Sequence, residues 1–362
     1  MKRIFIILAS ALTIMGANAQ TTQKLTATKA NEYGIVYSLP KTVLDITIET
    51  ETTVKEPGEF YKYAKKYLNE NNPIDKRSVK TVIKNVYVTP RGIADPEERY
   101  VVTFKPGNSP YLLINSENLP LAVNTEKTLK NDNPTLPTAQ QAEPTPLQTD
   151  AAKQVISEEM LQSQSTAKKA ELAAAQIYSL RQYRTDLLTG QSESMPPDGN
   201  ALQIVLDNIN AQEAALTAMF AGTTQVSTDV KTITYTPDEE VTDELLTRIS
   251  AAEGVVDKDD LSGAPMTITV KVIQKGEMPV NEKGNTLPFP KNGFAYRIPG
   301  KIEVTLYCDN DVIFNSQFET SQFGITYGLN PNSFTDKKEP LYVILNPVNG
   351  AIAEMGDATV QQ

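Results

Sequence analysis

Histidine and tryptophan are both absent from this sequence of 362 residues, and the absence of histidine limits its chemistry most. Without an imidazole the chain lacks the usual general base, a common zinc and copper ligand, and both the Ser/His/Asp and the Cys/His arrangements of nucleophilic catalysis. There is also no G-x-x-x-x-G-K phosphate loop and no G-x-G-x-x-G turn after a strand. We therefore expect no enzymatic activity, no catalytic residues, no cofactor and no metal site.

Cysteine is nearly absent, since Cys308 is the only one. A single thiol cannot form an internal disulfide, however oxidising the compartment. Cys308 lies in the apolar-rich segment IEVTLYC, where we expect it to be a small side chain of the core. No run of about 18 apolar residues follows the N-terminal segment, so the sequence predicts no membrane-spanning helix.

The first 20 residues, MKRIFIILASALTIMGANAQ, have the pattern of a secretory signal peptide. Lys2 and Arg3 precede a short apolar run, and small residues follow at Ala17 and Ala19. We expect cleavage after Ala19 and an exported product that is periplasmic, outer-membrane associated or secreted. A buried N-terminal helix is the alternative, but the segment lacks the alternation of an amphipathic helix.

The chain is acidic, with a formal net charge of −10 that includes the two basic residues of the signal peptide. An acidic surface repels the phosphates of nucleic acid and the head groups of anionic lipids. We therefore expect no nucleic-acid partner.

Residues 20–114 read as a β-rich unit with one short helix. From residue 33 to residue 54, apolar and polar residues alternate in two runs separated by Pro40, which predicts half-buried strands. The segment EPGEFYKYAKKYL has apolar residues at four-residue steps and predicts an amphipathic helix lying across the sheet. Further strands are predicted at residues 79–88, 99–104 and 111–114.

Residues 115–150 are rich in proline and poor in large apolar side chains, which predicts a partly extended linker. Residues 151–222 then consist of strong helix formers on either side of a Pro/Gly break at residues 190–199. The apolar stripes on either side of this break predict an antiparallel helical hairpin, with Asn200 as the N-cap of the second helix and Gly222 as its end.

Residues 223–362 read as a second β-rich unit. The order strand (VSTDVKTITYTP), helix (DEEVTDELLTRISAAEG), strand (MTITVKVIQ) resembles that of residues 42–88 and suggests two copies of one unit. A meander follows, with predicted tight turns at Asp309–Asn310–Asp311 and at Asn349–Gly350. The expected fold is α+β: two β-rich units, each with a short helix packed on antiparallel strands, and an inserted helical hairpin.

Several separate motifs occur in an order that resembles a family of exported Bacteroidetes proteins known only as a domain of unknown function. These motifs are SLPKT, EPGEFYKYAKKYLN, IADPEERY, IYSLRQYRTDLLTGQ, AQEAALTAMFAG, GFAYRIPG and SQFGI. The resemblance implies a secreted or periplasmic location and no particular activity. One departure is Asn69, where a glycine often follows the helix in the family pattern, and it affects only the local helix cap.

Arg181 and Arg184 are the most conspicuous charged pair, because they lie three residues apart on the first predicted long helix. They could hold an anionic ligand, or pair across the hairpin with Asp207 or Glu213. In an antiparallel hairpin with this break, the numbers of facing residues add up to about 390. This geometry favours Asp207 as the partner.

Carboxylates offer the remaining catalytic alternative, since two of them suffice for glycoside hydrolysis. Asp95, Glu97 and Glu98 are predicted on a loop that leads into a strand, where a ligand could reach them. An ordinary turn is the competing interpretation, and sugar sites usually also contain tryptophan. The acidic run at residues 257–260 lacks the glycine and terminal glutamate of a calcium loop and is expected to be a solvated turn.

The 15 tyrosines include several that could either pack in the core or form a contact surface. The candidates on the predicted helices are Tyr61, Tyr63, Tyr67, Tyr178 and Tyr183. Our leading hypothesis is a non-enzymatic exported protein that acts as an interaction or structural component of the cell envelope and binds a protein partner. The alternative is a carbohydrate-binding or carboxylate-based carbohydrate-active protein, with a glycan as the ligand.

Overall fold

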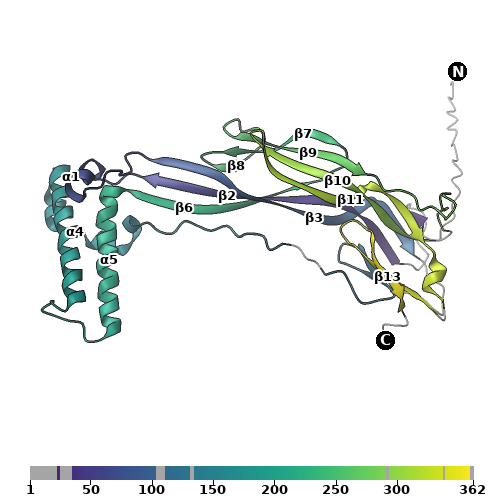
Figure 1. The fold of residues 1–362 in the computed structure, drawn as a ribbon, viewed down its shortest axis with the longest axis horizontal. Coiled ribbons are helices and arrows are strands. Elements are labelled where there is room, and N and C mark those ends of the chain that lie inside the picture. Colours follow the sequence, from purple (N-terminus) through teal and green to yellow (C-terminus); the bar gives the residue numbers. More distant parts are fainter. Residues whose placement is uncertain are drawn as a thin grey trace, which may run out of the picture.

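The protein is described by a computed structural model that covers residues 23–24, 35–102, 111–130, 134–290, 293–336 and 339–358. It is an elongated α+β molecule, with antiparallel sheets along most of its length and a bundle of helices at one end (Figure 1). Within the described residues, no helix is both long and apolar enough to cross a membrane. The predicted signal peptide, residues 1–19, lies outside the described residues.

A long ribbon of strands forms the axis of the molecule (Figure 1). Strand β2 (Ile35–Glu56) pairs with β3 (Ser78–Val102) on one side and with β6 (Thr223–Tyr235) on the other, and β1 (Gln23–Lys24) pairs with β3. The separate strands predicted on either side of Pro40 are one strand. The pairing of β2 with β3 shifts register between Ser38 and Pro40, and such an irregularity accommodates a residue that has no backbone N–H.

A second sheet packs on this ribbon, with the order β11–β10–β9–β7–β8. Its strands are β7 (Val241–Ser250), β8 (Gly254–Val256), β9 (Ala264–Gln274), β10 (Phe294–Cys308) and β11 (Asp311–Leu329). The shared core contains Leu44, Ile46, Ile48, Met266, Ile268, Val270, Ile302, Val304 and Leu306. The predicted turn between β10 and β11 is confirmed: Asp309 and Asn310 have φ values of 49° and 71°, as a two-residue hairpin turn requires.

The helix predicted within DEEVTDELLTRISAAEG is wrong, because most of this segment is strand β7. Its pairing with β9 shifts register between Val241 and Glu244 and again between Leu245 and Thr247. Each irregularity inserts residues into the strand, so its apolar residues recur at four-residue steps and imitate a helix. Without this helix the strand–helix–strand repeat is not present.

A third sheet joins strands from before the helices to the last strands of the chain, in the order β13–β12–β5–β4. It combines β4 (Leu112–Ile114) and β5 (Pro120–Val123) with β12 (Leu341–Leu345) and β13 (Ile352–Asp357). The ribbon likewise combines strands from before and after the helices. Because two of the three sheets contain strands of both predicted β-rich units, the two-unit layout is not confirmed.

The segment between β5 and the helices, which we call the returning segment, runs back along the molecule to the helical end (Figure 1). It touches the ribbon at Gln140, which exchanges two backbone hydrogen bonds of 2.9 Å with Thr228. A short 3-10 turn, Pro146–Gln148, then leads into the helices. The first residues of the predicted linker, 115–150, belong to the third sheet.

The helical end contains the two long helices that the sequence predicts, α4 (Thr166–Thr189) and α5 (Gly199–Ala221). Two short helices precede them, α2 (Asp150–Gln154) and α3 (Glu158–Gln162). The N-cap of α5 is Asp198 rather than Asn200, because the Asp198 carboxylate accepts a 2.8 Å hydrogen bond from the backbone N–H of Ala201. Gly222 ends the helix as predicted.

The short helix α1 (Ala64–Leu68) packs on the helical bundle and not across the sheet as predicted. The Phe60 ring, just before it, lies 5.4 Å from the Phe220 ring of α5, and the Phe60 N–H donates a 2.7 Å hydrogen bond to the carbonyl of Met219. Asn69 ends α1 in the left-handed conformation with φ 55°, which asparagine tolerates better than most residues. The departure from the family pattern at this position therefore leaves the cap intact.

Candidate functional site

The two arginines of α4 bind one carboxylate across the hairpin, and it is Glu213. Arg181 Nε lies 2.6 Å from Glu213 Oε1, and Arg184 Nη1 lies 2.6 Å from Glu213 Oε2. Arg184 also donates a 2.9 Å hydrogen bond to Asn210 Oδ1. The predicted partner Asp207 is wrong, since it accepts a hydrogen bond from Gln203 of its own helix.

The error in the predicted pairing has a geometric cause. Side chains on a helix lean toward its N-terminus. In an antiparallel hairpin, the arginines of α4 and the carboxylate of Glu213 therefore lean toward each other, although their backbones lie at different levels. The long arginine side chains span the remaining distance.

Replacing Glu213 by glutamine should lower the free energy of unfolding of the helical end by about 1–2 kcal/mol. The Glu213 side chain is only 13% exposed, so its loss removes charge-assisted hydrogen bonds and leaves two guanidinium groups facing each other. Urea unfolding followed by circular dichroism measures this change. The matched control Asp207→Asn should stay within about 0.5 kcal/mol of wild type; equal effects of the two changes would contradict the pairing.

Next to the arginines, basic and aromatic side chains form a continuous surface that we call the aromatic-basic strip. It consists of Lys62, Lys65, Lys66, Tyr67, Tyr178 and Arg181. Lys66 Nζ lies 4.7 Å from the centre of the Tyr67 ring, and Arg181 lies 5.8 Å from that of Tyr178. Tyr178 Oη donates a 2.7 Å hydrogen bond to the Tyr67 carbonyl, which joins α4 to α1.

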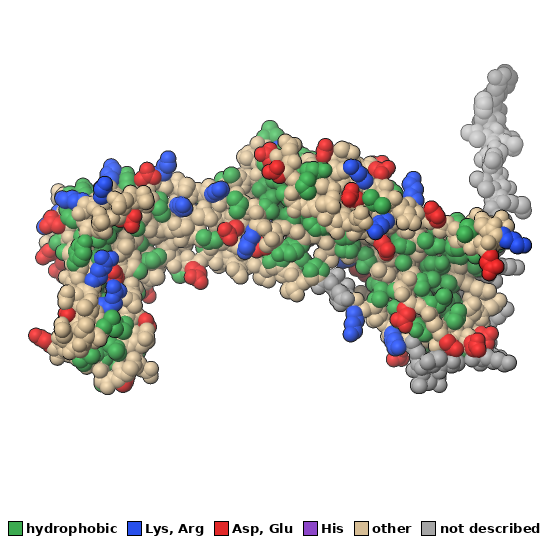
Figure 2. Space-filling model, viewed as in Figure 1, with side chains coloured by type: hydrophobic (Ala, Val, Ile, Leu, Met, Phe, Trp, Pro, Cys, Tyr) green, Lys and Arg blue, Asp and Glu red, His purple; other side chains and the backbone are tan. Residues whose placement is uncertain are grey.

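The tyrosines of the helical end divide between core and surface. Tyr63 and Tyr67 pack partly buried against the helical core, whereas Tyr178 and Tyr183 are 52% and 44% exposed. Figure 2 shows basic side chains spaced down this face of the hairpin with hydrophobic side chains between them. Aromatic and arginine side chains are the types that protein interfaces favour.

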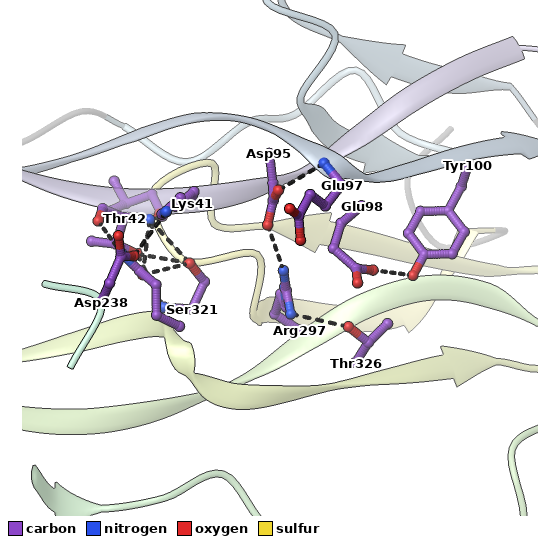
Figure 3. A network of polar contacts seen from close by, with 12 residues as sticks. Lys41, Thr42, Asp95, Glu97, Glu98, Tyr100, Asp238, Arg297, Ser321 and Thr326 are labelled. Carbon is purple, nitrogen blue, oxygen red and sulfur yellow. Dashed lines mark hydrogen bonds and ion pairs between the residues drawn. The ribbon is translucent and has the colours of Figure 1, made fainter. Parts of the chain in front are cut away.

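The carboxylates proposed as a sugar site occupy strand β3 and not a loop. Asp95 forms a 3.1 Å ion pair with Arg297, with side-chain exposures of 15% and 12%, and accepts a hydrogen bond from the Glu97 N–H (Figure 3). Glu98 accepts a hydrogen bond from the Tyr100 hydroxyl, and burial together with this bond raises the pKa of Tyr100. Asp95 and Glu98 thus make internal contacts that hold β3 to β10 and order its end.

Other titratable candidates lie apart from this network. Asp257–Asp260 lie in the turn between β8 and β9, where hydrogen bonds from the side chain and the N–H of Ser262 lower the pKa of Asp260. In the described part of the chain, no group of three or more Asp, Glu, His or Cys side chains is placed to hold a metal ion. Cys308 is half-buried against the core between the sheets, and this burial raises its pKa.

A polar groove of about 490 Å³ lies between β6 and the returning segment, and the sequence did not reveal it. Its lining residues are Glu51, Lys84, Gln140, Gln141, Glu143, Pro144, Thr145, Pro146 and residues 224–228. Gln225 bridges the two walls by donating to the Glu143 carbonyl at 3.1 Å. A groove of this kind depends on where the linker docks, and no local pattern in a Pro-rich segment specifies that.

Comparison with known proteins adds a family but no activity. No curated protein and no solved structure matches this chain. A family model described as a domain of unknown function, DUF4831, matches residues 33–353. That match covers β2, β3 and β6 of the ribbon, the helical end and nearly all of the C-terminal strands. The chain therefore belongs to the DUF4831 family.

Proposed function

We propose that this protein is a non-enzymatic, exported component of the cell envelope whose helical end binds a protein partner. The observation that carries the proposal is the exposure of large apolar side chains on the hairpin. Leu188 and Ile204, near the tip, are 64% and 62% exposed, and Tyr178 is 52% exposed. Large apolar side chains exposed on a projecting element suit contact with a partner.

The placement of the hairpin supports the same function. Among the described residues, the helical end is connected to the rest of the molecule by the ribbon and the returning segment, and the hairpin projects away from the ribbon axis (Figure 1). The short helices cover the part of the hairpin nearest the ribbon, so its far half consists of α4 and α5 alone. A projecting helix pair of this kind suits contact with another protein better than it suits an enclosed site.

The chemistry of the chain also supports a non-enzymatic role. It has no histidine, and two of the three carboxylates considered for catalysis, Asp95 and Glu98, accept hydrogen bonds from neighbouring side chains. The carbohydrate alternative has no observation in its favour comparable to the hairpin. The N-terminal sequence supports export, and we place the mature protein in the periplasm or at the outer membrane.

Photo-crosslinking in the native cell tests this function. A photoreactive amino acid replaces Leu188 on the hairpin, and in a control variant it replaces Val312, which is 59% exposed on β11. We expect Leu188 to capture a defined protein and Val312 to capture none or a different one. Identical products at both positions, or no product at Leu188, would overturn the proposal.

A further inference from the structure

The three lysines of the strip, unlike Arg181, form no ion pair in the described structure. Lys62, Lys65 and Lys66 are all exposed on the short helical segment before Asn69, and none forms an ion pair with a described residue. Three like charges on one short segment repel one another locally, although the chain as a whole has a net charge of −10. An external anion bound at the three lysines would reduce this local repulsion.

The three lysines continue into a surface that is already ordered. Lys62 lies over the Tyr61 ring at 5.7 Å, and Lys66 lies over the Tyr67 ring and donates to its hydroxyl at 3.2 Å. From Tyr67 the strip passes through the Tyr178 hydrogen bond to Arg181, whose position Glu213 fixes. Because these contacts already position Lys62, Lys66 and Arg181, binding would require little further ordering of those side chains.

We propose that the aromatic-basic strip docks an acidic peptide segment of the partner protein. This proposal rests on the proposed function and adds the chemistry of the partner. Carboxylates on an extended or helical segment would pair with Lys62, Lys65 and Lys66, and apolar side chains between them would contact Tyr67 and Tyr178. The partner is recognised by charge complementarity, with the aromatic rings excluding water from the ion pairs.

The charges around the strip favour an acidic peptide over larger polyanions. The hairpin beyond the strip carries Asp186, Glu193, Asp198 and Asp207 near its tip. A membrane surface or a long nucleic acid that reached the lysines would also approach these carboxylates and be repelled. A short acidic segment can follow the strip and avoid them. The same acidic tip disfavours a second copy of this chain as the occupant.

Fluorescence anisotropy with a labelled poly-glutamate peptide tests the proposal on the full mature chain. We expect saturable binding that weakens as salt is raised. The variant K62E/K65E/K66E should bind at least about tenfold more weakly, because three attractive pairs become repulsive. The control K258E/K275E/K283E makes the same charge change on exposed lysines of the three sheets and their loops, which we call the β body, and should bind like wild type. Unaltered thermal unfolding of both variants shows that they are folded.

Three outcomes would overturn the inference. The first is no binding of poly-glutamate by wild type, and the second is equal loss of binding in both charge-reversal variants. The third is tighter binding of phosphatidylglycerol vesicles or heparin than of the peptide. If Leu188 still captures a protein in the cell under any of these outcomes, the proposed function stands and only the acidic character of the partner is wrong. If Leu188 captures nothing, the function itself fails.

Discussion

Replacing Phe220 by alanine should destabilise the helical end by about 3–5 kcal/mol and unfold it at a lower urea concentration than the sheets. Phe220 is fully buried and packs against Phe60, so its loss leaves a cavity where the bundle meets the ribbon. The buried core of the sheets contains other residues and does not depend on this contact. Hydrogen–deuterium exchange should show faster exchange in α4 and α5 while β9 and β10 keep their protection.

The matched control for this change is Tyr183→Ala. Tyr183 is also aromatic and also lies in the bundle, but it is 44% exposed. We expect its replacement to change stability by no more than about 0.5 kcal/mol. A Phe220→Ala variant in which helices and sheets unfold together at one urea concentration would contradict the view that the helical end has a core of its own.

Replacing Asp95 by alanine should lower the free energy of unfolding of the β body by about 3–5 kcal/mol. The change leaves the Arg297 guanidinium without its described counter-charge at a site where that side chain is only 12% exposed. Arg297 has little room to adapt, because its Nε is already buried without a hydrogen-bond partner among the described residues. Chemical unfolding followed by tyrosine fluorescence measures the loss.

Two comparisons separate a structural role of Asp95 from a ligand-binding one. Glu97→Ala removes a neighbouring but exposed carboxylate and should be nearly neutral. The double variant Asp95→Ala/Arg297→Met should recover much of the stability, because it removes the uncompensated charge as well. A fully stable Asp95→Ala variant would contradict the structural role and would favour a ligand-binding role for Asp95.

The helical end shows what local sequence patterns can predict. The long helices follow from strong helix formers with a Pro/Gly break, and the stop at Gly222 follows from the same reasoning. The predicted N-cap, Asn200, lies two residues after the observed one, because Asn200 and Asp198 are both good capping residues and only the backbone geometry decides between them.

Strand β7 shows why the sequence pattern predicts a helix where the second sheet has a strand. Its apolar residues follow a helical period only because register shifts interrupt the pairing with β9, and such shifts depend on a neighbour distant in sequence. The predicted position of α1 is wrong for a similar reason. The sequence shows that the segment has an apolar face, but it does not show that this face packs against Phe220 of α5 and not against the sheet.

The candidate site was predictable in its residues and not in its arrangement. Arg181, Arg184 and the tyrosines of the helices were singled out from the sequence, and the pairing across the hairpin was expected. Glu213 was misjudged because backbone level alone ignores the direction of helical side chains. The link from Tyr67 to Tyr178, more than 100 residues apart, depends on how α1 docks on α4 and has no local signal.

Lysine reactivity in native envelopes tests most directly the central claim, that a partner covers the aromatic-basic strip of the helical end. Envelopes are treated with an amine-acetylating reagent, and the modification of each lysine is compared with that of the purified mature protein. We predict that Lys62, Lys65 and Lys66 are protected in the envelope, while Lys258 and Lys283 on the β body react equally in both samples. Equal reactivity of the three strip lysines in the two samples would show that nothing covers this surface and would contradict the account.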